Sequence, residues 1–218
     1  MTEPNDPETL DPSTLGRGRF FAFEGGEGCG KSTQAARLAE RLGAVLTFEP
    51  GDTEIGARLR ELLLDPATKG LDGRAEALLM AADRAQHVAE VVRPALDAGR
   101  DVVTDRYAGS SIAYQGYGRG LPVDGIRALS QFAHDGLEPD VVILLQVPVD
   151  VATARLRTTP DRMEAAGREF HDRVLAGYET QAVENPDRWV VLDGSGPIDD
   201  VAEAVWHAVV ERTAEVEA

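Results

Sequence analysis

The sequence predicts an α/β fold in which helices cover both faces of a central parallel five-stranded sheet. Short apolar segments alternate with segments of helical periodicity, and the first apolar segment runs through a glycine-rich turn into a helix. Continuous apolar character is typical of strands that are buried on both faces of a parallel sheet. Five segments have it: residues 20–23, 44–48, 101–104, 141–145 and 189–192.

Helices are expected between these strands. In residues 74–96 apolar side chains recur every third or fourth position, and Pro94 is expected to kink or shorten this helix near its end. Residues 32–42 form a further helical run, and a proline followed by two aspartates marks the start of a last helix at about 197–213. No internal repeat or change of composition divides the chain, so we expect one domain over residues 19–218.

The composition limits the classes of protein that the chain can belong to. Its 218 residues include 22 basic and 38 acidic ones, a formal net charge of −16. Such a surface repels polyanions, so we expect no nucleic-acid partner. A single cysteine excludes an internal disulfide, and no apolar run approaches the roughly 18–20 residues that cross a membrane. With no secretory signal at the acidic N-terminus, a cytoplasmic globular protein is expected.

Residues 1–18 are rich in proline and acidic residues and show no apolar periodicity. We expect a disordered acidic tail there, with a partner-binding arm as the alternative interpretation.

A phosphate-binding loop follows the first predicted strand. The pattern G-x-x-x-x-G-K-[ST] is matched by Gly25, Gly26, Glu27, Gly28, Cys29, Gly30, Lys31 and Ser32. Glycines let backbone N–H groups converge on phosphate oxygens, and the helix N-terminus adds partial positive charge. Lys31 would reach the β- and γ-phosphates, and the Ser32 hydroxyl would ligate Mg²⁺. The motif, continued by Thr33, predicts a nucleoside-triphosphate site with Mg²⁺ as cofactor; a glycine-rich turn without a ligand is the alternative.

Cys29 occupies a variable position of this loop. A tolerated small residue is the simpler interpretation, and a redox switch is the other, because a thiol beside a helix N-terminus can have a lowered pKa.

Two common classes of P-loop protein do not fit. A GTPase needs an Asn-Lys-x-Asp sequence, and the only lysines, Lys31 and Lys69, lie outside any such pattern. A motor or helicase needs a strand ending in two acids, which the sequence lacks. Small size and scattered arginines favour a small-molecule phosphotransferase, because Arg forks hold phosphates well.

Further motifs accompany the P-loop and resemble the thymidylate kinase family over about residues 19–208. They are Phe23 to Thr33, Glu49-Pro50-Gly51-Asp52-Thr53, Asp105-Arg106-Tyr107, Ser110-Ser111-Ile112-Ala113-Tyr114-Gln115-Gly116 and Gly136-Leu137-Glu138-Pro139-Asp140. The resemblance implies a P-loop NTPase fold with a short arginine-bearing lid. It also implies transfer of the γ-phosphoryl group of ATP to dTMP, giving dTDP and ADP, and a homodimer.

The resemblance also implies roles for the matching residues. Lys31, Asp105, Arg106 and Arg162 would be catalytic, and Ser32 and Asp105 would lie at the metal. Arg106 would grip the acceptor phosphate, Glu27 would accept a hydrogen bond from the deoxyribose 3′-hydroxyl, and Arg84 would read the thymine edge. The acceptor nucleotide would contact Glu27, Arg60, Met80, Arg84, Arg106, Ser111, Tyr114 and Gln115. Helix packing, a helix cap and solvated arginines are the alternative explanations for these side chains.

The lid is expected at residues 154–173, where five arginines face four acids in an otherwise acidic chain. Residues 26–29 of the P-loop include no arginine, so the resemblance implies that Arg162 of the lid stabilises the transferred group. A salt-bridged helix is the alternative interpretation.

Three positions depart from the family pattern: Phe48 stands where arginine is common, Met80 where phenylalanine stacks on thymine, and Gln146 where aspartate is common. They motivate a rival interpretation, another nucleotide or deoxynucleoside kinase with an altered acceptor pocket. A nucleotide-binding protein without catalysis is a rival from another class. The helix at 74–96 is a dimer face or ordinary core, and the four dispersed histidines are interpreted as structural or surface residues.

Overall fold

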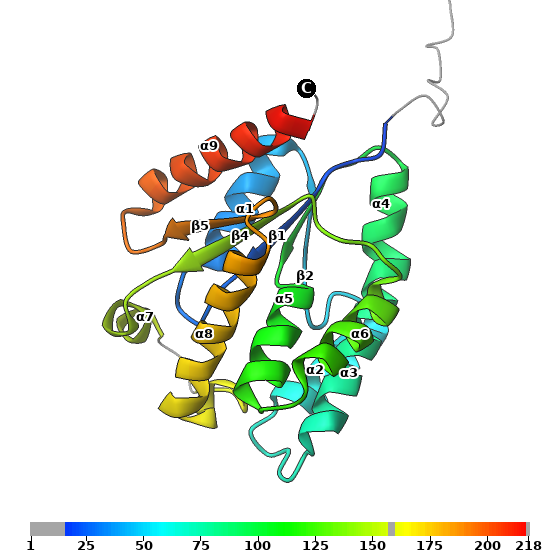
Figure 1. Cartoon of the computed structure of the whole chain (residues 1–218). Coiled ribbons are helices and arrows are strands. Elements are labelled where there is room, and N and C mark those ends of the chain that lie inside the picture. The colour runs from blue at the N-terminus through cyan, green and yellow to red at the C-terminus, as the bar shows by residue number, and fades with distance from the viewer. Residues whose placement is uncertain (1–15, 157–159, 217–218) are drawn as a thin grey trace, which may run out of the picture.

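The computed structural model describes residues 16–156 and 160–216 and confirms the predicted α/β fold (Figure 1). Its five strands are all parallel and lie in the order β2-β3-β1-β4-β5. Each overlaps a predicted segment: β1 (Phe20–Glu24), β2 (Val45–Phe48), β3 (Val102–Asp105), β4 (Val141–Gln146) and β5 (Trp189–Asp193). Residues 1–15, most of the predicted tail, lie outside the described residues.

Helical segments connect the strands. After β1 comes α1 (Lys31–Leu42), and between β2 and β3 lie α2 (Glu54–Leu64), α3 (Gly73–His87), η2 (Val88–Val92) and α4 (Arg93–Asp97). Between β3 and β4 lie α5 (Ala108–Ser111), η3 (Ile112–Gly118) and α6 (Val123–His134). The remainder are α7 (Val149–Arg155), η4 (Glu164–Ala166), α8 (Arg168–Glu184) and α9 (Ile198–Val216).

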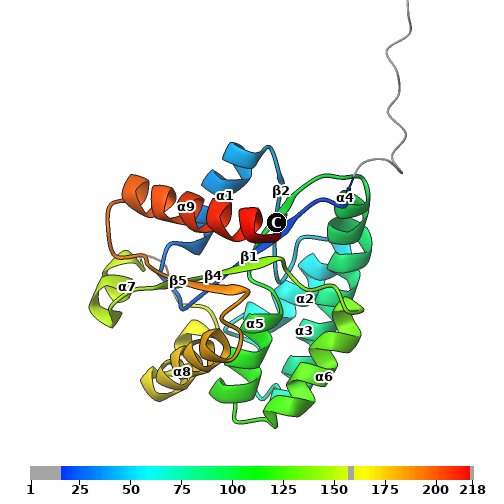
Figure 2. The same ribbon diagram turned by 45° about the horizontal axis from the view of Figure 1, so that its top comes forward.

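Helices cover both faces of the sheet, as Figures 1 and 2 show. Successive residues of a strand point to opposite faces. Phe21, Phe23 and Ile143 therefore pack in one apolar cluster with residues of α1 and α9, while Phe20 and Ala22 pack in another with residues of η2 and α4. Both faces of β1 are fully buried, which explains its continuous apolar sequence.

The helix expected over residues 74–96 is present but is not a single α-helix. It begins as α3, passes through the π-helical segment η2, and ends as α4, with Pro94 in the first turn of α4. Proline cannot donate a hydrogen bond, and its ring would clash with the carbonyl four residues earlier. The wider π-helical turns accommodate both effects, so the helical path continues through Pro94.

The sheet topology places the predicted site. The order of the strands reverses around β1, which has β3 on one side and β4 on the other. Ligands of open α/β sheets bind beyond the carboxyl ends of the strands at such a reversal. Phe23 of β1 pairs with Asp105 of β3, so the P-loop and the segment after Asp105 leave the sheet side by side.

None of the helices in the described parts of the chain combines the length and the apolar character that a membrane span requires.

The packing of η3 against α8 depends on a small residue, and we expect Gly118→Ala to be destabilising. A Cβ at Gly118 would lie 2.6 Å from the Phe170 ring and 2.9 Å from Val174. Overpacking of this kind costs about 1–3 kcal/mol, which urea denaturation would measure as a lower free energy of unfolding.

Gly125→Ala in α6 is the matched control, because its Cβ would meet nothing closer than 3.8 Å. Alanine favours helix over glycine, so this variant should be neutral or stabilised. Equal stability losses in the two variants would contradict the packing explanation.

Candidate active site

The turn between β1 and α1 is shaped to receive phosphate. Gly25 has a φ of 139°, and a Cβ there would lie 2.4 Å from the carbonyl oxygen of Leu145, so only glycine fits. Gly30 caps α1, whose first turn has no acidic side chain, so the helix dipole favours an anion at this end. Lys31 Nζ donates to the Gly26 carbonyl at 2.7 Å, which holds the ammonium group against the loop.

Ser32 and Asp105 meet at the side of this loop. Ser32 Oγ donates to Asp105 Oδ2 at 2.5 Å, and the buried Asp105 Oδ1 has no hydrogen-bond partner within residues 16–156 and 160–216. Mg²⁺ prefers oxygen ligands and commonly takes one or two from protein and the rest from water and substrate phosphates. The two side chains therefore fit a Mg²⁺ ion that arrives with a nucleotide.

Arg106 joins the P-loop to the elements that follow β3. Its φ of 75° is left-handed, a conformation that costs a non-glycine residue about 1–3 kcal/mol. The guanidinium is fixed by Glu27, by the Gly25 carbonyl at 3.2 Å, and by Ser110 Oγ and the Tyr178 hydroxyl at 3.1 Å each. These partners hold the cation at the junction of the loop, α5 and α8.

Glu27 is a carboxylate at neutral pH. Burial raises its pKa, but the charges of Arg106 and Lys31 and a hydrogen bond from Tyr114 outweigh burial and bring the pKa to about 2. The Tyr114 hydroxyl donates to Glu27 Oε1 at 2.9 Å. An ionised carboxylate accepts hydrogen bonds only, which suits recognition of a hydroxyl group.

A cavity of about 170 Å³ lies beside Arg106 and contains every residue predicted to contact the acceptor nucleotide. Its lining includes Glu27, Arg60, Met80, Arg84, Arg106, Ser111, Tyr114 and Gln115. A neighbouring cavity of about 320 Å³ is lined by Lys31, Ser32 and Asp105. The two share Glu27, Glu49, Arg60 and Arg106, so the predicted acceptor and phosphate-transfer residues lie at adjoining spaces.

A larger cavity of about 560 Å³ lies between the P-loop and the helices α7 and α8. Gly26, Glu27 and Cys29 contribute to its wall. Cys29 is itself only 2% exposed.

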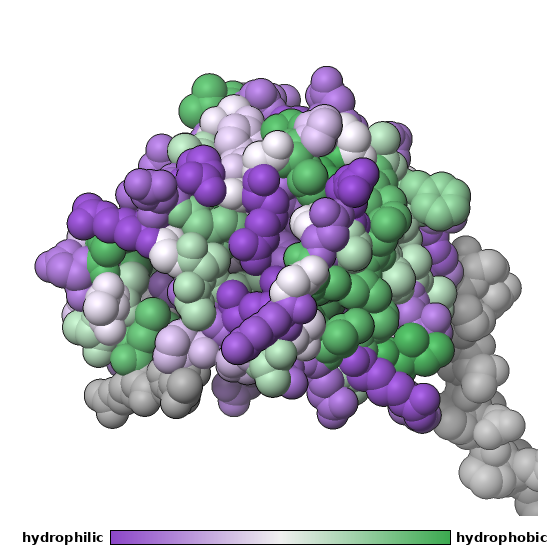
Figure 3. All heavy atoms as spheres, turned by 90° about the horizontal axis from the view of Figure 1, so that it is seen from below, coloured by the Kyte–Doolittle hydropathy of each residue, from purple (hydrophilic) through white to green (hydrophobic). Residues whose placement is uncertain are grey.

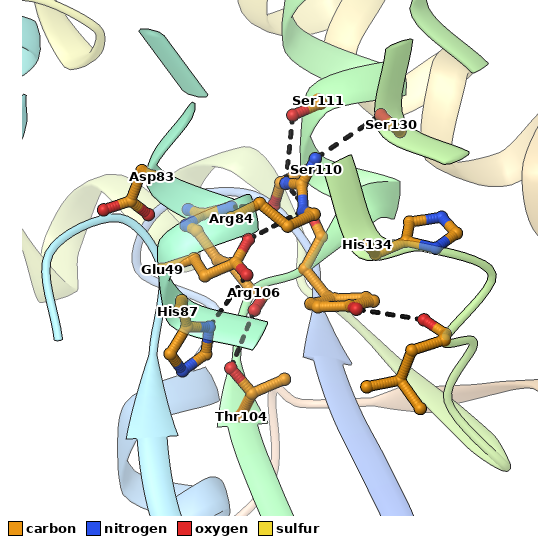
Figure 4. A network of polar contacts seen from close by, with 12 residues as sticks. Glu49, Asp83, Arg84, His87, Thr104, Arg106, Ser110, Ser111, Ser130 and His134 are labelled. Atoms are coloured by element: carbon orange, nitrogen blue, oxygen red, sulfur yellow. Dashed lines mark hydrogen bonds and ion pairs between the residues drawn. The ribbon is translucent and has the colours of Figure 1, made fainter. Parts of the chain in front are cut away.

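Arg84 is buried in the wall of the cavity of about 170 Å³, and nearly all of its N–H groups donate hydrogen bonds to protein atoms. Nε donates to Glu49 Oε2 at 2.9 Å, and Nη2 donates to the Tyr107 carbonyl at 3.0 Å and to Ser111 Oγ at 3.1 Å. Figure 4 shows the guanidinium between Glu49 on one side and Ser111 and Ser130 on the other. Its orientation is therefore fixed before any ligand binds.

Arg60 lines the same cavity and the neighbouring one. Its Nη1 donates to the Pro50 carbonyl at 2.6 Å, and its guanidinium carbon lies 5.5 Å from the centre of the Phe48 ring. Phe48, which departs from the family pattern, thus packs against the arginine next to it. Met80 lines the cavity from α3.

The structure does not bring Arg162 to the P-loop. Its Nη1 forms an ion pair with Glu76 Oε2 at 2.7 Å, and its Nε donates to the Leu63 carbonyl at 2.7 Å. Gln115 and Arg119 bind the same carboxylate, at 2.9 and 3.0 Å. Through Glu76, Arg162 therefore lies close to Gln115, which lines the cavity of about 170 Å³.

Arg155, at the end of α7, is an arginine of the predicted lid that contacts the P-loop. Its Nη1 lies 3.5 Å from the Gly28 carbonyl and 2.9 Å from the Gly194 carbonyl, to which it donates. Residues 157–159 of the predicted lid lie outside the described residues.

Sequence reasoning missed the buried carboxylates that organise the site. The four acids Glu24, Glu49, Glu76 and Asp83 are each at most 5% exposed. Glu24 and Glu49 directly follow predicted strands, and this position was the sequence signal that could have identified them.

Among the histidines, His87 is completely buried against Glu49, so it belongs to the interior and not to the surface.

A parallel sheet with this loop after its first strand, and a second cavity facing the loop, defines a P-loop kinase of small molecules. Comparisons with known proteins agree. The model of the thymidylate kinase family matches residues 23–205. This chain belongs to the thymidylate kinase family.

Individual relatives support the assignment over most of the chain. A thymidylate kinase of Leifsonia xyli is 50% identical over 193 residues, 85% of this chain and 91% of the relative. One of Desulfovibrio desulfuricans is 46% identical over 196 residues, 84% of this chain and 90% of the relative. A crystal structure of the Ehrlichia chaffeensis thymidylate kinase superposes with a TM-score of 0.75 at 32% identity, covering 88% of this chain and 99% of that one.

Asp83 makes the stability of the site dependent on pH. Burial and the nearby Glu49 charge raise its pKa to about 6, although His87 and Arg84 oppose them. The unfolded chain has an Asp pKa of about 3.9, so the folded state binds more protons between these values and loses stability as the pH rises from about 4 to about 6. We expect Asp83→Asn to be more stable than wild type by about 2 kcal/mol at neutral pH, but not near pH 4.

Urea denaturation at several pH values would measure this difference. The Asn side chain can keep the bond that Asp83 Oδ1 accepts from Gly51 N at 3.0 Å. Asp97→Asn, at an exposed position of α4, removes the same charge and is the matched control. A stability difference for Asp83→Asn that is constant with pH would contradict the expected pKa.

Proposed function

We propose that the chain transfers the γ-phosphoryl group of ATP to dTMP, giving dTDP and ADP, within a kinase domain over residues 19–218. The observation that carries the proposal is the pair of adjoining cavities that share Arg106 and Glu27. A donor on the P-loop and an acceptor in the smaller cavity would present their phosphates to each other there. Holding two reactants in this way supplies much of the rate enhancement in phosphoryl transfer.

On the donor side, residues 25–33 bind the phosphates of ATP. Backbone N–H groups and the N-terminus of α1 neutralise the phosphate oxygens, and Lys31 reaches the β- and γ-groups. Ser32 and Asp105 hold Mg²⁺, which supplies further charge neutralisation when it is bound. Lys31 is already oriented by the Gly26 carbonyl.

On the acceptor side, Arg106 and Arg60 bind the phosphate of dTMP and Arg84 reads the edge of the base. Glu27 accepts a hydrogen bond from the 3′-hydroxyl. Ser111, Gln115 and Met80 line the base, and Tyr114 disfavours a 2′-hydroxyl by its bulk. The fixed orientation of the buried Arg84 supports its role, because a donor that is positioned in advance loses little freedom when the base binds.

ADP release with Mg²⁺-ATP and each of dTMP, dUMP, dCMP, dGMP and UMP would test the proposal. We expect a clear preference for dTMP, and loss of turnover when Mg²⁺ is chelated. A shifted preference would favour a kinase with an altered acceptor pocket. ATP binding with no turnover on any acceptor would favour a nucleotide-binding protein without catalysis.

Arg162 remains the proposed catalytic arginine, and the same assay separates this role from a structural one. Arg162 and Arg119 both pair with Glu76, so Arg119→Ala is the matched control for Arg162→Ala. If Arg162 stabilises the transferred group, kcat falls about a thousandfold in Arg162→Ala and at most about tenfold in Arg119→Ala. Equal losses in both variants would assign Arg162 to positioning Glu76.

We also propose a homodimer that uses α2, α3 and α6, acting in the cytoplasm without a nucleic-acid partner. Large apolar side chains are exposed on these helices: Ile55 and Leu62 on α2, Leu78 on α3 and Phe132 on α6. Figure 3 shows a hydrophobic patch bordered by hydrophilic residues on the side where Figure 1 places these helices. Contiguous exposed apolar surface of this kind is typical of an interface. The net charge of −16 argues against nucleic acid.

Sedimentation velocity would test the dimer. We expect the wild type to sediment as a dimer and Leu78→Asp as a monomer, because a charge in the interface has no partner there. Val183→Asp on α8, at a valine that is 81% exposed, should leave the dimer intact. A wild-type monomer at all concentrations would exclude the interface.

A further inference from the structure

A series of hydrogen-bonded side chains leads from Asp52, which is half-buried in the segment after β2, to the buried Arg84. The Thr47 hydroxyl donates to Asp52 and lies 2.6 Å from His87 Nε2. His87 Nδ1 lies 2.9 Å from Glu49 Oε1, and Glu49 Oε2 accepts from Arg84 Nε at 2.9 Å. Figure 4 shows His87 and Arg84 reaching Glu49 from the same helix. This series of hydrogen bonds thus ends at the Arg84 guanidinium, which lines the cavity of about 170 Å³.

The donors and acceptors in this series of hydrogen bonds fix the protonation state of the His87 ring. An ionised carboxylate can only accept, and a threonine hydroxyl has a single hydrogen to donate. Since Thr47 gives that hydrogen to Asp52, His87 Nε2 must itself donate to Thr47. Since Glu49 can only accept, Nδ1 must donate as well. Both ring nitrogens therefore carry hydrogen.

We propose that His87 is a positioning residue that, as a doubly protonated imidazolium, orients Glu49 and through it Arg84 for binding of the acceptor base. The proposal rests on the proposed role of Arg84 in binding dTMP. His87 itself lines neither cavity, so it acts through its partners Glu49 and Thr47, of which Glu49 is the one that binds Arg84. It is completely buried, so no water competes for its two donors.

The charges around His87 support an imidazolium. Burial raises the pKa of Glu49, but Arg84 and then His87 outweigh it, so the pKa of Glu49 is lowered and the group stays ionised. Other titratable groups face this network from several elements: Asp83 on α3, Asp52 after β2, Tyr107 after β3 and His134 on α6. Burial lowers the pKa of His134. The acids next to His87 balance its charge together with that of Arg84.

If the His87 ring lost one of its two N–H protons, one hydrogen bond of this series would be lost. A neutral imidazole has a single N–H, so it can donate to Glu49 or to Thr47 but not to both. The other pair would then face each other as two acceptors, and the orientation of Glu49 would no longer be fixed. We therefore expect the KM for dTMP to rise with pH as this proton is lost.

Asp52→Asn tests the proton count directly. The amide can donate to Thr47 Oγ, which frees the Thr47 hydrogen to bond a neutral His87 Nε2 while Nδ1–H still donates to Glu49. In this variant every hydrogen bond from position 52 to Glu49 forms with a neutral His87 ring. The KM for dTMP should rise about tenfold with pH in the wild type, the value of one hydrogen bond to a charged group, and stay level in Asp52→Asn. Asp200→Asn, at an exposed position of α9, is the matched control and should follow the wild type.

The ¹⁵N resonances of the ring provide a second readout that does not depend on turnover. We expect both ring nitrogens of His87 to show protonated shifts at neutral pH in the full-length protein, with His87→Gln identifying the signals. His87→Gln should raise the KM for dTMP about tenfold and leave kcat and the KM for ATP unchanged. Thermal unfolding would confirm that the variants fold.

The two experiments test the protonation state of His87 and its positioning role separately. A neutral ring at neutral pH overturns the protonated state, and identical pH profiles for wild type and Asp52→Asn overturn the positioning role. Failure of the wild type to bind dTMP would contradict the proposed function instead, and the ring nitrogens would still decide the state of His87. The proposal is supported if both ring nitrogens of His87 are protonated at neutral pH and the KM for dTMP of Asp52→Asn does not change with pH.

Discussion

The site depends on one buried carboxylate, Glu24, which ties the end of β1 to the segment after β3. It accepts hydrogen bonds from Tyr107 N at 3.0 Å, Ser110 N at 2.9 Å, Ser110 Oγ at 2.6 Å and the Tyr178 hydroxyl at 3.1 Å. Burial raises the pKa of Glu24, although the hydrogen bonds from Ser110 and Tyr107 N and the charge of Arg106 oppose the rise. A buried acid is tolerated because its oxygens are satisfied. Its bonds pull α5 and α8 onto the carboxyl end of the sheet.

The left-handed backbone of Arg106 follows from this attachment. Asp105 ends β3 in register with Phe23, while Tyr107 and Ser110 are bound to Glu24, so the chain must turn sharply at the single residue between them. The strain is compensated by the contacts of the guanidinium and of the residues on either side. The P-loop, Arg106 and α8 are thereby fixed relative to one another before any nucleotide is present.

The sequence predicted what depends on local pattern. The central strands β1, β3 and β4 were recognisable because a strand buried on both faces is apolar throughout. The partly exposed edge strands β2 and β5 were recognisable as short segments rich in apolar and β-branched residues. The P-loop was recognisable because its glycines and Lys31 are adjacent in the chain. The eight acceptor residues could be named only through the family resemblance, since they come together from distant segments. The pairing of Arg162 with Glu76 joins positions far apart in sequence, and no local signal announces such a contact. The same holds for His87 and Glu49, whose roles depend on burial.

The arrangement of charge explains how so acidic a chain can bind anions. Arg84 and Arg106 are each held by a carboxylate, Glu49 and Glu27, so the cations are positioned in advance and their ordering is not left to the ligand. Glu27, with a pKa of about 2, is ionised at neutral pH before a phosphate approaches Arg106. The phosphate must therefore share or displace this carboxylate, which then needs a new donor. A nucleotide that brings both a phosphate for Arg106 and a sugar hydroxyl for Glu27 satisfies both partners of the resting ion pair, and a bare phosphate satisfies only one.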